Sequence, residues 1–523
     1  MPRPCSFARA PVLLALIWLI VFAPPALPRA SEAKAFDHFP RDVQTQLRLL
    51  DRLSWGANAT SQAQLKQEGL GNWLKQQLHP SSQSLPLAAQ AQIDAMTISQ
   101  TPFDQLVISV IEQRQFIAKL DDGEQKKIAR QEYQQRFNQI TNETQKRFLL
   151  RTLYSENQLQ EQMTWFWINH FSVNIRRGIV RAMVGDYENS AIRPHALGKF
   201  RDLLGAVVHH PAMLLYLNNN SNFSNHINEN FARELMELHT LGVGSGYSQK
   251  DVQELARVLT GLGVNIRPLD SPAPKPKPAS QSEYVRRGLF EFDPVRHDYG
   301  PKTLLGQPIE SRGLAETDEA LDRLASSPAT ARFISRKLAI HFVTDDPPRE
   351  LVDRMASTFS LSNGDIAATL QTMFESPEFS TSLGQKFRDP IHYVIACVRL
   401  AYDNRVVSNV APIVSWLNRM GQPLYGRETP DGYPLNASAW SSAGQMNTRF
   451  EIARDIGTNG IALFRTNDKN SPAPLPSPIF ANSSIGRMLQ SNLNSNTRAA
   501  LAAARTPEEW NTLLFASPEL MYR

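Results

Sequence analysis

The chain has 523 residues, a formal net charge of +5, 42% hydrophobic residues and two cysteines. This length exceeds one ordinary hydrophobic core, so we expect two packed subdomains. Two cysteines exclude a disulfide framework and metal sites built from repeated Cys-x-x-Cys pairs.

The N-terminal residues have the pattern of a secretory signal peptide. Arg3 and Arg9 precede an apolar run over residues 12–23, and a proline breaker with small residues follows. This run is too short to cross a bilayer core of about 30 Å, so we expect no stable membrane span after cleavage. Cleavage after Ala35 would make Phe36 the mature start, and an uncleaved anchor is the alternative. We therefore expect an exported protein, periplasmic or extracellular.

Removal of residues 1–35 changes what the charge indicates. The segment holds four basic residues and one acid, so the formal charge falls from +5 to +2. A charge this small gives no support to a nucleic-acid partner, and we expect none. Cys5 is removed with the segment, which leaves Cys397 alone and excludes an intramolecular disulfide.

The first half of the mature chain predicts one helix after another. Val43, Leu47 and Leu50 form an apolar stripe at helical spacing, and apolar residues recur similarly through the Gln-rich segment 103–162. Residues 163–174 then place four large aromatic side chains around Asn169 and His170. Such a run is typical of core packing, and the alternative is a dry pocket in which His170 is a ligand or a base.

Residues 228–242 place three carboxylates, an arginine and a histidine in one expected helix. Glu229, Arg233 and Glu237 follow one another at i, i+4 spacing, so each acid can pair with the arginine. Glu234 and Glu237 are three residues apart, as in helical carboxylate pairs that bind metals. His239 falls about 140° around an α-helix from Glu234. These five are our candidate catalytic residues, and a solvated salt-bridge ladder is the structural alternative.

A Pro-rich tract over residues 268–282 predicts an extended loop between two subdomains. Beyond it, residues 288–294 and 302–306 are short strand-like runs around a turn, which predicts a small β-hairpin near 288–306. His297 lies in that turn, followed by Asp298. Turn chemistry alone is one explanation for this pair, and a role for His297 in binding a metal is the other.

The C-terminal half again predicts helices. A capping residue followed by proline marks four helix starts, at Ser327-Pro328, Ser376-Pro377, Asp389-Pro390 and Thr506-Pro507. Cys397 lies in an apolar helical run, and we expect a buried thiol. The fold class is therefore mostly α. We expect a signal peptide (1–35), an N-terminal helical subdomain (36–267), the Pro-rich loop (268–282), a C-terminal helical subdomain (283–466) and a Pro/Asn-rich segment with terminal helices (467–523).

The candidate metal ligands are His170, Glu234, Glu237 and His297. Imidazole and carboxylate ligands suit a divalent cation or an iron centre, which could activate water or oxygen. This set requires the fold to bring segments more than a hundred residues apart into one site. The sequence names no cofactor, and no haem-attachment motif supports a haem bound by His170 or His239.

Several motifs together resemble the bacterial domain-of-unknown-function family 1800. They are Phe166-Trp-Ile-Asn-His-Phe171, the 228–243 segment, Ala256-Arg-Val-Leu-Thr-Gly261, His297-Asp-Tyr-Gly-Pro-Lys-Thr-Leu-Leu-Gly306 and Ala331-Arg-Phe-Ile-Ser-Arg-Lys-Leu338. The resemblance covers roughly residues 45–460. It implies an exported, mostly helical protein, and a second exported protein as a partner. Ile168 departs from the family pattern, where a second histidine is usual, and Gly432-Tyr433-Pro434 replaces a Gly-Trp-Pro step.

Two functions fit these patterns. The chain contains no Gly-x-Ser-x-Gly elbow, Walker loop or Rossmann glycine fingerprint, which disfavours the commonest hydrolase and nucleotide-binding classes. The first hypothesis is an exported enzyme with a carboxylate and histidine site that performs metal-assisted hydrolysis or oxidation. The second is a non-catalytic helical scaffold or binding protein that acts with another exported protein.

Overall fold

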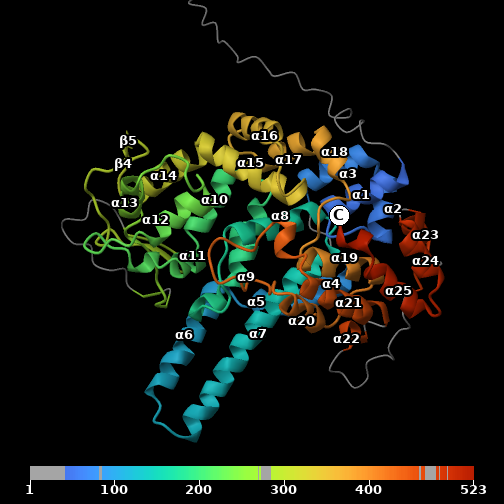
Figure 1. The fold of residues 1–523 in the computed structure, drawn as a ribbon. Helices are drawn as coiled ribbons and strands as arrows, with labels where there is room; N and C mark the ends of the chain where they lie inside the picture. The colour runs from blue at the N-terminus through green and yellow to red at the C-terminus, as the bar shows by residue number, and fades with distance from the viewer. Residues whose placement is uncertain are drawn as a thin grey trace, which may run out of the picture.

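The structure is a computed structural model that describes residues 42–81, 85–268, 270–271, 284–458, 461–465, 479–481, 483–491 and 493–523. Within these ranges the chain forms 25 α-helices and five short strands (Figure 1). The predicted mostly α fold is therefore confirmed. The predicted signal peptide and most of the Pro-rich loop lie outside the described residues.

Of the N-terminal helices, the first three lie together at one end of the molecule, and the next two pack against the longer helix that follows them (Figure 1). They are α1 (Val43–Leu53), α2 (Ala59–Glu68), α3 (Leu70–Leu78), α4 (Leu87–Asp94) and α5 (Thr97–Gln100). The Asp42 side chain caps α1 by accepting a hydrogen bond from the Thr45 amide, and Asn58 caps α2 through Ser61. These caps satisfy amide groups that have no partner within the helix.

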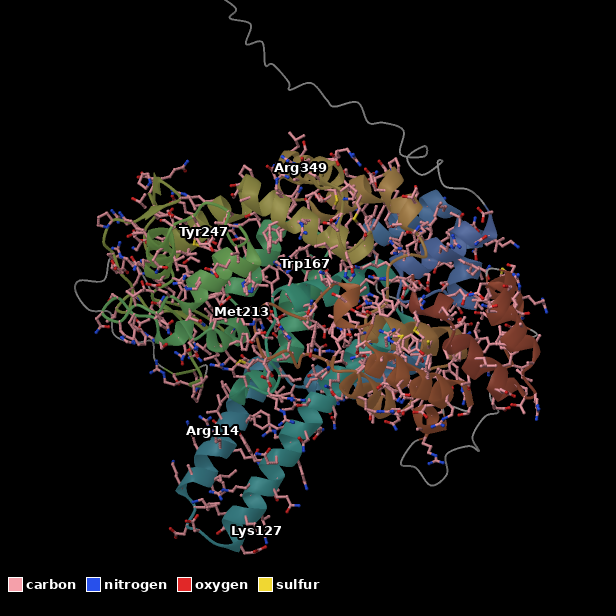
Figure 2. All side chains as sticks on the ribbon, viewed as in Figure 1. Arg114, Lys127, Trp167, Met213, Tyr247 and Arg349 are labelled. Carbon is pink, nitrogen blue, oxygen red and sulfur yellow. The ribbon has the colours of Figure 1, made fainter. Side chains whose placement is uncertain are left out.

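Two long helices form an arm that extends away from the body (Figure 1). They are α6 (Phe103–Lys119) and α7 (Glu124–Tyr154). Lys127 lies at the tip of this arm (Figure 2). The next helix, α8 (Gln158–His170), has no exposed residue along its length. A helix buried on all sides lies in the centre of a fold, and Trp167 of α8 lies near the middle of the molecule in Figure 2.

Short helical elements connect α8 to the 228–242 segment. They are η2 (Gly178–Ala182), α9 (Val184–Asp186), η3 (Tyr187–Ile192), η4 (Arg193–His195), α10 (Phe200–Val208), α11 (Pro211–Tyr216) and η5 (Asn219–Ser221). The 228–242 segment itself contains α12 (Asn230–Glu234) and η6 (Leu235–His239), and α13 (Gln249–Val258) follows.

The strands form two small antiparallel sheets. They are β1 (Leu262–Val264), β2 (Val285–Arg287), β3 (Phe290–Phe292), β4 (Thr303–Leu304) and β5 (Gln307–Pro308). The strand order is β1-β3-β2 in one sheet and β4-β5 in the other. The predicted pairing of residues 288–294 with residues 302–306 is wrong. Instead, β3 pairs with β2 and β1, and β4 pairs with β5 across the turn at Gly306, which has a φ of +77°. Tight local turns decide this pairing.

Helices and the loops that connect them make up the rest of the described chain. They are α14 (Leu314–Ser326), α15 (Pro328–Phe342), α16 (Arg349–Leu361), α17 (Ile366–Phe374), α18 (Pro377–Ser382), α19 (Pro390–Tyr402), α20 (Ala411–Arg419), η7 (Ala437–Ala439), α21 (Ala443–Thr458), α22 (Ile461–Phe464), α23 (Ser484–Ser491), α24 (Ser495–Ala502), α25 (Pro507–Phe515) and η8 (Pro518–Met521). The four predicted starts are confirmed, because α15, α18, α19 and α25 each begin at the proline and each has a side-chain cap.

The C-terminal residues return to the first helix. The Arg52 guanidinium is buried and donates a hydrogen bond of 2.6 Å to the carbonyl of Arg523. One continuous set of buried apolar residues runs from Leu49 to Met521. The division into two subdomains stays a prediction. Cys397 is buried in α19 as expected, and burial raises its thiol pKa to about 12. Among the described residues, no helix is long and apolar enough to cross a membrane.

Candidate functional site

The helix expected over residues 228–242 changes its winding in the middle. Residues Asn230–Glu234 are α-helical, but Leu235–His239 form a π-helical turn. The hydroxyl of Thr240 donates to the carbonyl of Leu235, five residues earlier, at 2.7 Å. Residues five apart lie on one side of a π-turn. Glu234 and His239 are therefore closer in direction than an α-helix allows, and π-turns are frequent at functional sites.

The predicted salt-bridge ladder is present on the outer face of this segment. Arg233 lies 2.9 Å from the Glu229 carboxylate and 3.6 Å from that of Glu237. Gln249 of α13 accepts from Arg233 at 3.1 Å and donates to Glu229 at 2.7 Å. The Arg233 side chain is 37% exposed. These three charged residues therefore connect α12 to α13 at the surface.

The carboxyl group of Glu234 has a raised pKa. Burial raises its pKa, and the neighbouring Glu237 carboxylate raises it further. Burial also raises the pKa of Tyr247, whose hydroxyl is hydrogen-bonded to Glu237. A carboxyl group with a raised pKa can hold a proton closer to neutral pH than an ordinary glutamate can.

The histidines of the two sequence motifs meet in the interior. The Nε2 atom of His170, at the end of α8, lies 3.0 Å from the carbonyl oxygen of His239. Because a carbonyl oxygen only accepts, Nε2 carries the proton and donates it. The other ring nitrogen of His170, Nδ1, lies 2.8 Å from Nζ of Lys337 in α15. Nδ1 is therefore the acceptor, and Lys337 is the donor.

Burial shifts the pKa values of all three side chains in this cluster. It lowers the pKa of His170 far below the usual range, and the charge of Lys337 adds to the effect. It lowers the pKa of His239 to about 3, again with a contribution from Lys337. It lowers the pKa of Lys337 to about 8, against an opposing effect of the Asp431 carboxylate. Both histidines are thus neutral at pH 7, and the amine of Lys337 titrates close to neutral pH.

The His239 ring in this cluster lacks the hydrogen-bond partners that burial normally requires. Neither ring nitrogen of His239 has a hydrogen-bond partner among the described residues. Lys337 donates to His170, but among the described residues it has no ion-pair partner. An unpaired buried polar group costs about 1–3 kcal/mol.

Aromatic rings surround the cluster. The ring of Phe171 is 4.5 Å from that of His170 and 5.1 Å from that of His239, measured between centroids. Phe166 stacks on His170 at 6.3 Å, and the Lys337 amine lies 5.5 Å from the Phe333 ring. Such a shell excludes water and lowers the local dielectric constant, which explains why burial dominates the pKa shifts.

A loop after α20 packs against the end of α8 beside His170. The amide of Asn169 donates to the Tyr433 carbonyl at 2.9 Å and accepts from the Tyr433 backbone N–H at 2.6 Å. Gly432 has a φ of +77°, and a side chain there would collide with the Asn169 carbonyl. Asp431 forms an ion pair of 2.9 Å with Arg427. The loop thus brings the Asp431 carboxylate within electrostatic range of Lys337.

Lys337 and Asp431 were missed as site residues. Lys337 lies in the 331–338 motif that carried the family resemblance, but a lysine in an amphipathic helix is usually exposed. Asp431 precedes the Gly-Tyr-Pro step that was also noted in the sequence. Their position in those two motifs was the available signal.

The fourth predicted ligand, His297, belongs to a different network. Its Nδ1 atom lies 2.7 Å from the Thr260 carbonyl, and its Nε2 atom lies 3.2 Å from the Glu316 carboxylate. The Lys302 amine lies 2.6 Å from the other oxygen of Glu316. All three charged or polar side chains are buried. Burial opposes ionisation of Glu316, but hydrogen bonds from His297 and Lys302 lower its pKa. This network joins the strand region to α14.

The four predicted metal ligands therefore do not form one group. Across residues 42–523, with the undescribed gaps left out, no three His, Cys, Asp or Glu side chains are arranged to hold a metal ion. His170 and His239 meet, as a shared site requires, whereas His297 is committed to Glu316.

One family model matches nearly the whole chain. The model of the family described as "Protein of unknown function (DUF1800)" matches residues 48–522. Comparisons with curated proteins and with solved structures give no match. The matched range includes α8, the π-turn, α15 and the loop around Asp431. The chain belongs to the DUF1800 family of proteins of unknown function.

Proposed function

We propose that the protein is an enzyme that uses acid–base catalysis, with the Lys337 amine as the proton acceptor. The observation that carries this proposal is the contact of 2.8 Å between Lys337 Nζ and His170 Nδ1 in a shell of aromatic rings. A general base works best when its pKa lies near the working pH. The pKa of Lys337 is lowered to about 8 by burial, so roughly a tenth of the amine is neutral at pH 7.

The same molecule contains a structural lysine for comparison. Lys302 is buried and makes a 2.6 Å ion pair with Glu316, as a network that serves only stability requires. Lys337 is instead next to a neutral histidine, and Asp431 acts on it only through its charge. Strongly perturbed ionisable groups are typical of functional sites. This contrast favours the enzyme over the scaffold hypothesis.

The remaining residues of the cluster have distinct roles in this proposal. His170 is held in one tautomer by the His239 carbonyl, so its Nδ1 lone pair orients the Lys337 amine. Glu234, whose pKa is raised by burial and which interacts electrostatically with Asp431, is the candidate proton donor. Glu229, Arg233 and Glu237 hold the π-turn segment against α13 and are positioning residues.

We also propose that the protein is exported and acts beside a second exported protein. The support is the signal-peptide pattern of residues 1–35 and the implication of the family resemblance. N-terminal sequencing of the protein recovered from the periplasm or medium tests the first part. The expected first residue is Phe36. An intact N-terminus on protein that stays in the cytoplasm would contradict it.

Substitution of Lys337 tests the catalytic proposal. The mature wild type is assayed from pH 6 to 10 against panels of model esters, amides and carbonyl compounds. Any compound that it converts is then assayed with two variants. Lys337→Met should lower kcat/KM by at least about 100-fold. Lys127→Met, at the tip of the arm, should leave kcat/KM unchanged. The wild-type rate should rise through a pKa of about 8. A folded Lys337→Met variant with full activity would overturn the proposal.

A further inference from the structure

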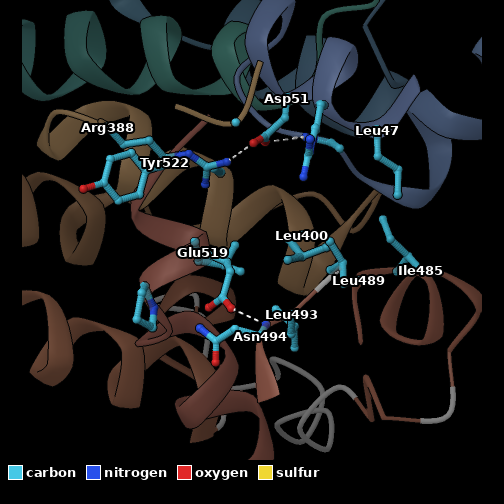
Figure 3. Close-up of a pocket in the computed structure, with 16 residues that line it drawn as sticks. Leu47, Asp51, Arg388, Leu400, Ile485, Leu489, Leu493, Asn494, Glu519 and Tyr522 are labelled. Carbon is cyan, nitrogen blue, oxygen red and sulfur yellow. Dashed lines mark hydrogen bonds and ion pairs between the residues drawn. The ribbon is translucent and has the colours of Figure 1, made fainter. Parts of the chain in front are cut away.

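A second site lies far along the chain from the Lys337 cluster, where the first helix meets the C-terminal helices. A cavity of about 330 Å³ lies between α1, α19, α23 and η8 (Figure 3). Its walls are mainly aliphatic, with Leu47, Leu400, Ile485, Leu489, Leu493 and Leu520 among the lining residues. Cavities that bind small molecules start at about 300 Å³ and are predominantly apolar with a few polar groups. This cavity has the size and the lining of such a site.

Polar groups lie at both ends of the cavity, and the arginines lie at one of them. Arg388 forms an ion pair with Asp51 there, and its side chain is 3% exposed (Figure 3). The second oxygen of Asp51 accepts a hydrogen bond of 3.3 Å from the Ala57 amide. Each oxygen of Asp51 therefore has a partner. In contrast, Nη1 of Arg388 has no hydrogen-bond partner among the described residues. A buried guanidinium nitrogen without a partner is costly.

Arg48 adds a second positive charge at this end. It lines the cavity, is exposed to solvent and lies over Gly384, whose added Cβ would be 3.4 Å from Arg48 Nε. Two guanidinium groups thus face one carboxylate, which leaves an excess of one positive charge. At the other end, Glu519 accepts from the Asn494 amide at 2.7 Å and from the Thr497 hydroxyl at 3.0 Å. Both donors are neutral, so the negative charge of Glu519 stays at the far end, and the positive charge of the cavity is confined to the end with Arg48 and Arg388.

We propose that this cavity binds an amphipathic carboxylic acid, with its carboxylate at Arg48 and Arg388 and its aliphatic chain among the leucines. A carboxylate matches the two-nitrogen fork of a guanidinium, and the excess charge favours an anion over an alcohol or an amine. The aliphatic walls favour a hydrocarbon chain over a sugar or a nucleotide. The volume lies at the low end of the range for small-molecule sites, which suits a chain of medium length.

Titration calorimetry of the mature protein with decanoate and with decanol tests the assignment. Decanoate should bind at one site per chain, more tightly than decanol. Arg48→Ala should weaken decanoate at least ten-fold and change decanol less than two-fold, because only the carboxylate uses the charge. Arg349→Ala, a matched change of an exposed arginine on α16, should alter neither affinity.

A filling variant tests the cavity itself. Leu489→Trp places a larger side chain in the lining, and it should abolish binding of both decanoate and decanol. Thermal unfolding without ligand establishes that each variant is folded. The assignment is overturned if wild-type protein shows no saturable decanoate binding. It is equally overturned if folded Arg48→Ala binds decanoate as tightly as wild type, or if folded Leu489→Trp still binds it.

Discussion

The amine of Lys337 lies 2.8 Å from Nδ1 of His170, and this contact joins α15 to the end of the fully buried helix α8. Because Nε2 of His170 donates to the His239 carbonyl, the His239 backbone and the His170 and Lys337 side chains form one chain of contacts from the π-turn to α15. A lysine that donates to a neutral imidazole instead of a carboxylate has no full charge compensation. This arrangement lowers the pKa of Lys337 and carries a cost that stability measurements can detect.

Replacement of Lys337 by methionine should stabilise the protein at neutral pH. The folded pKa of about 8 lies below the usual value of 10.5, so the unfolded chain binds more protons between these two pH values. The wild type therefore has the full penalty below pH 8 and loses it as the pH rises to 10.5. The advantage of Lys337→Met should shrink by about 3 kcal/mol over this range. Urea unfolding at pH 7, 9 and 10.5 measures it, with Lys127→Met as the control whose difference stays flat.

His239 should destabilise the folded protein in acid. Burial lowers its pKa to about 3 from 6.5, so the unfolded chain binds a proton that the folded chain excludes. Stability from this group is complete above pH 6.5 and is lost as the pH falls toward 3, by up to about 5 kcal/mol. His239→Gln should move the acid-unfolding midpoint, followed by circular dichroism, to lower pH. His79→Gln, at an exposed position, should not. An unchanged midpoint for His239→Gln would contradict the pKa assignment.

The sequence alone predicted the helix starts and the ion pairs within one helix. Proline after a capping residue has a fixed φ and loses no hydrogen bond, so it identified the starts of α15, α18, α19 and α25. The ladder of Glu229, Arg233 and Glu237 followed from i, i+4 spacing. These features depend only on neighbouring residues.

The site depended on features that no local rule contains. The π-turn at Leu235–His239 has no sequence signature, and it changes which side of the helix His239 faces. Lys337 resembles any lysine of an amphipathic helix, and only the packing of α15 on α8 buries its amine. His297 has the same imidazole side chain as His170. Its partner Glu316 lies in α14 and could not be assigned from sequence spacing.

Two glutamates that look alike in the sequence should differ in their effect on stability. Glu316→Ala leaves the Lys302 ammonium and His297 buried without a carboxylate, which should cost about 3–5 kcal/mol. Glu237→Ala removes a partly exposed ion pair of 3.6 Å and should cost less than about 1 kcal/mol. Urea denaturation of both variants compares the two. A Glu237→Ala variant that unfolds would show instead that this acid is structural, as the scaffold hypothesis requires.

The loop containing Asp431 should depend on Gly432. A methyl group at this residue would collide with the Asn169 carbonyl, and its φ of +77° is unfavourable for alanine. Gly432→Ala should therefore release the loop from α8 and lower the free energy of unfolding by about 1–3 kcal/mol. Limited proteolysis should show new cleavage within residues 426–436. Gly444→Ala, where an added Cβ meets no atom, is the control that should leave both unchanged.

The titration of the Lys337 amine is the most direct test of the central claim. Competitive acylation of lysines across pH 6–11, followed by mass spectrometry of the peptide containing Lys337, gives the pKa of this side chain in the folded protein. The predicted pKa is about 8, and it should rise when His170 and its aromatic shell are opened by denaturant. A pKa near 10.5 in the folded protein would contradict the account, because the amine would then be an ordinary ammonium group at neutral pH.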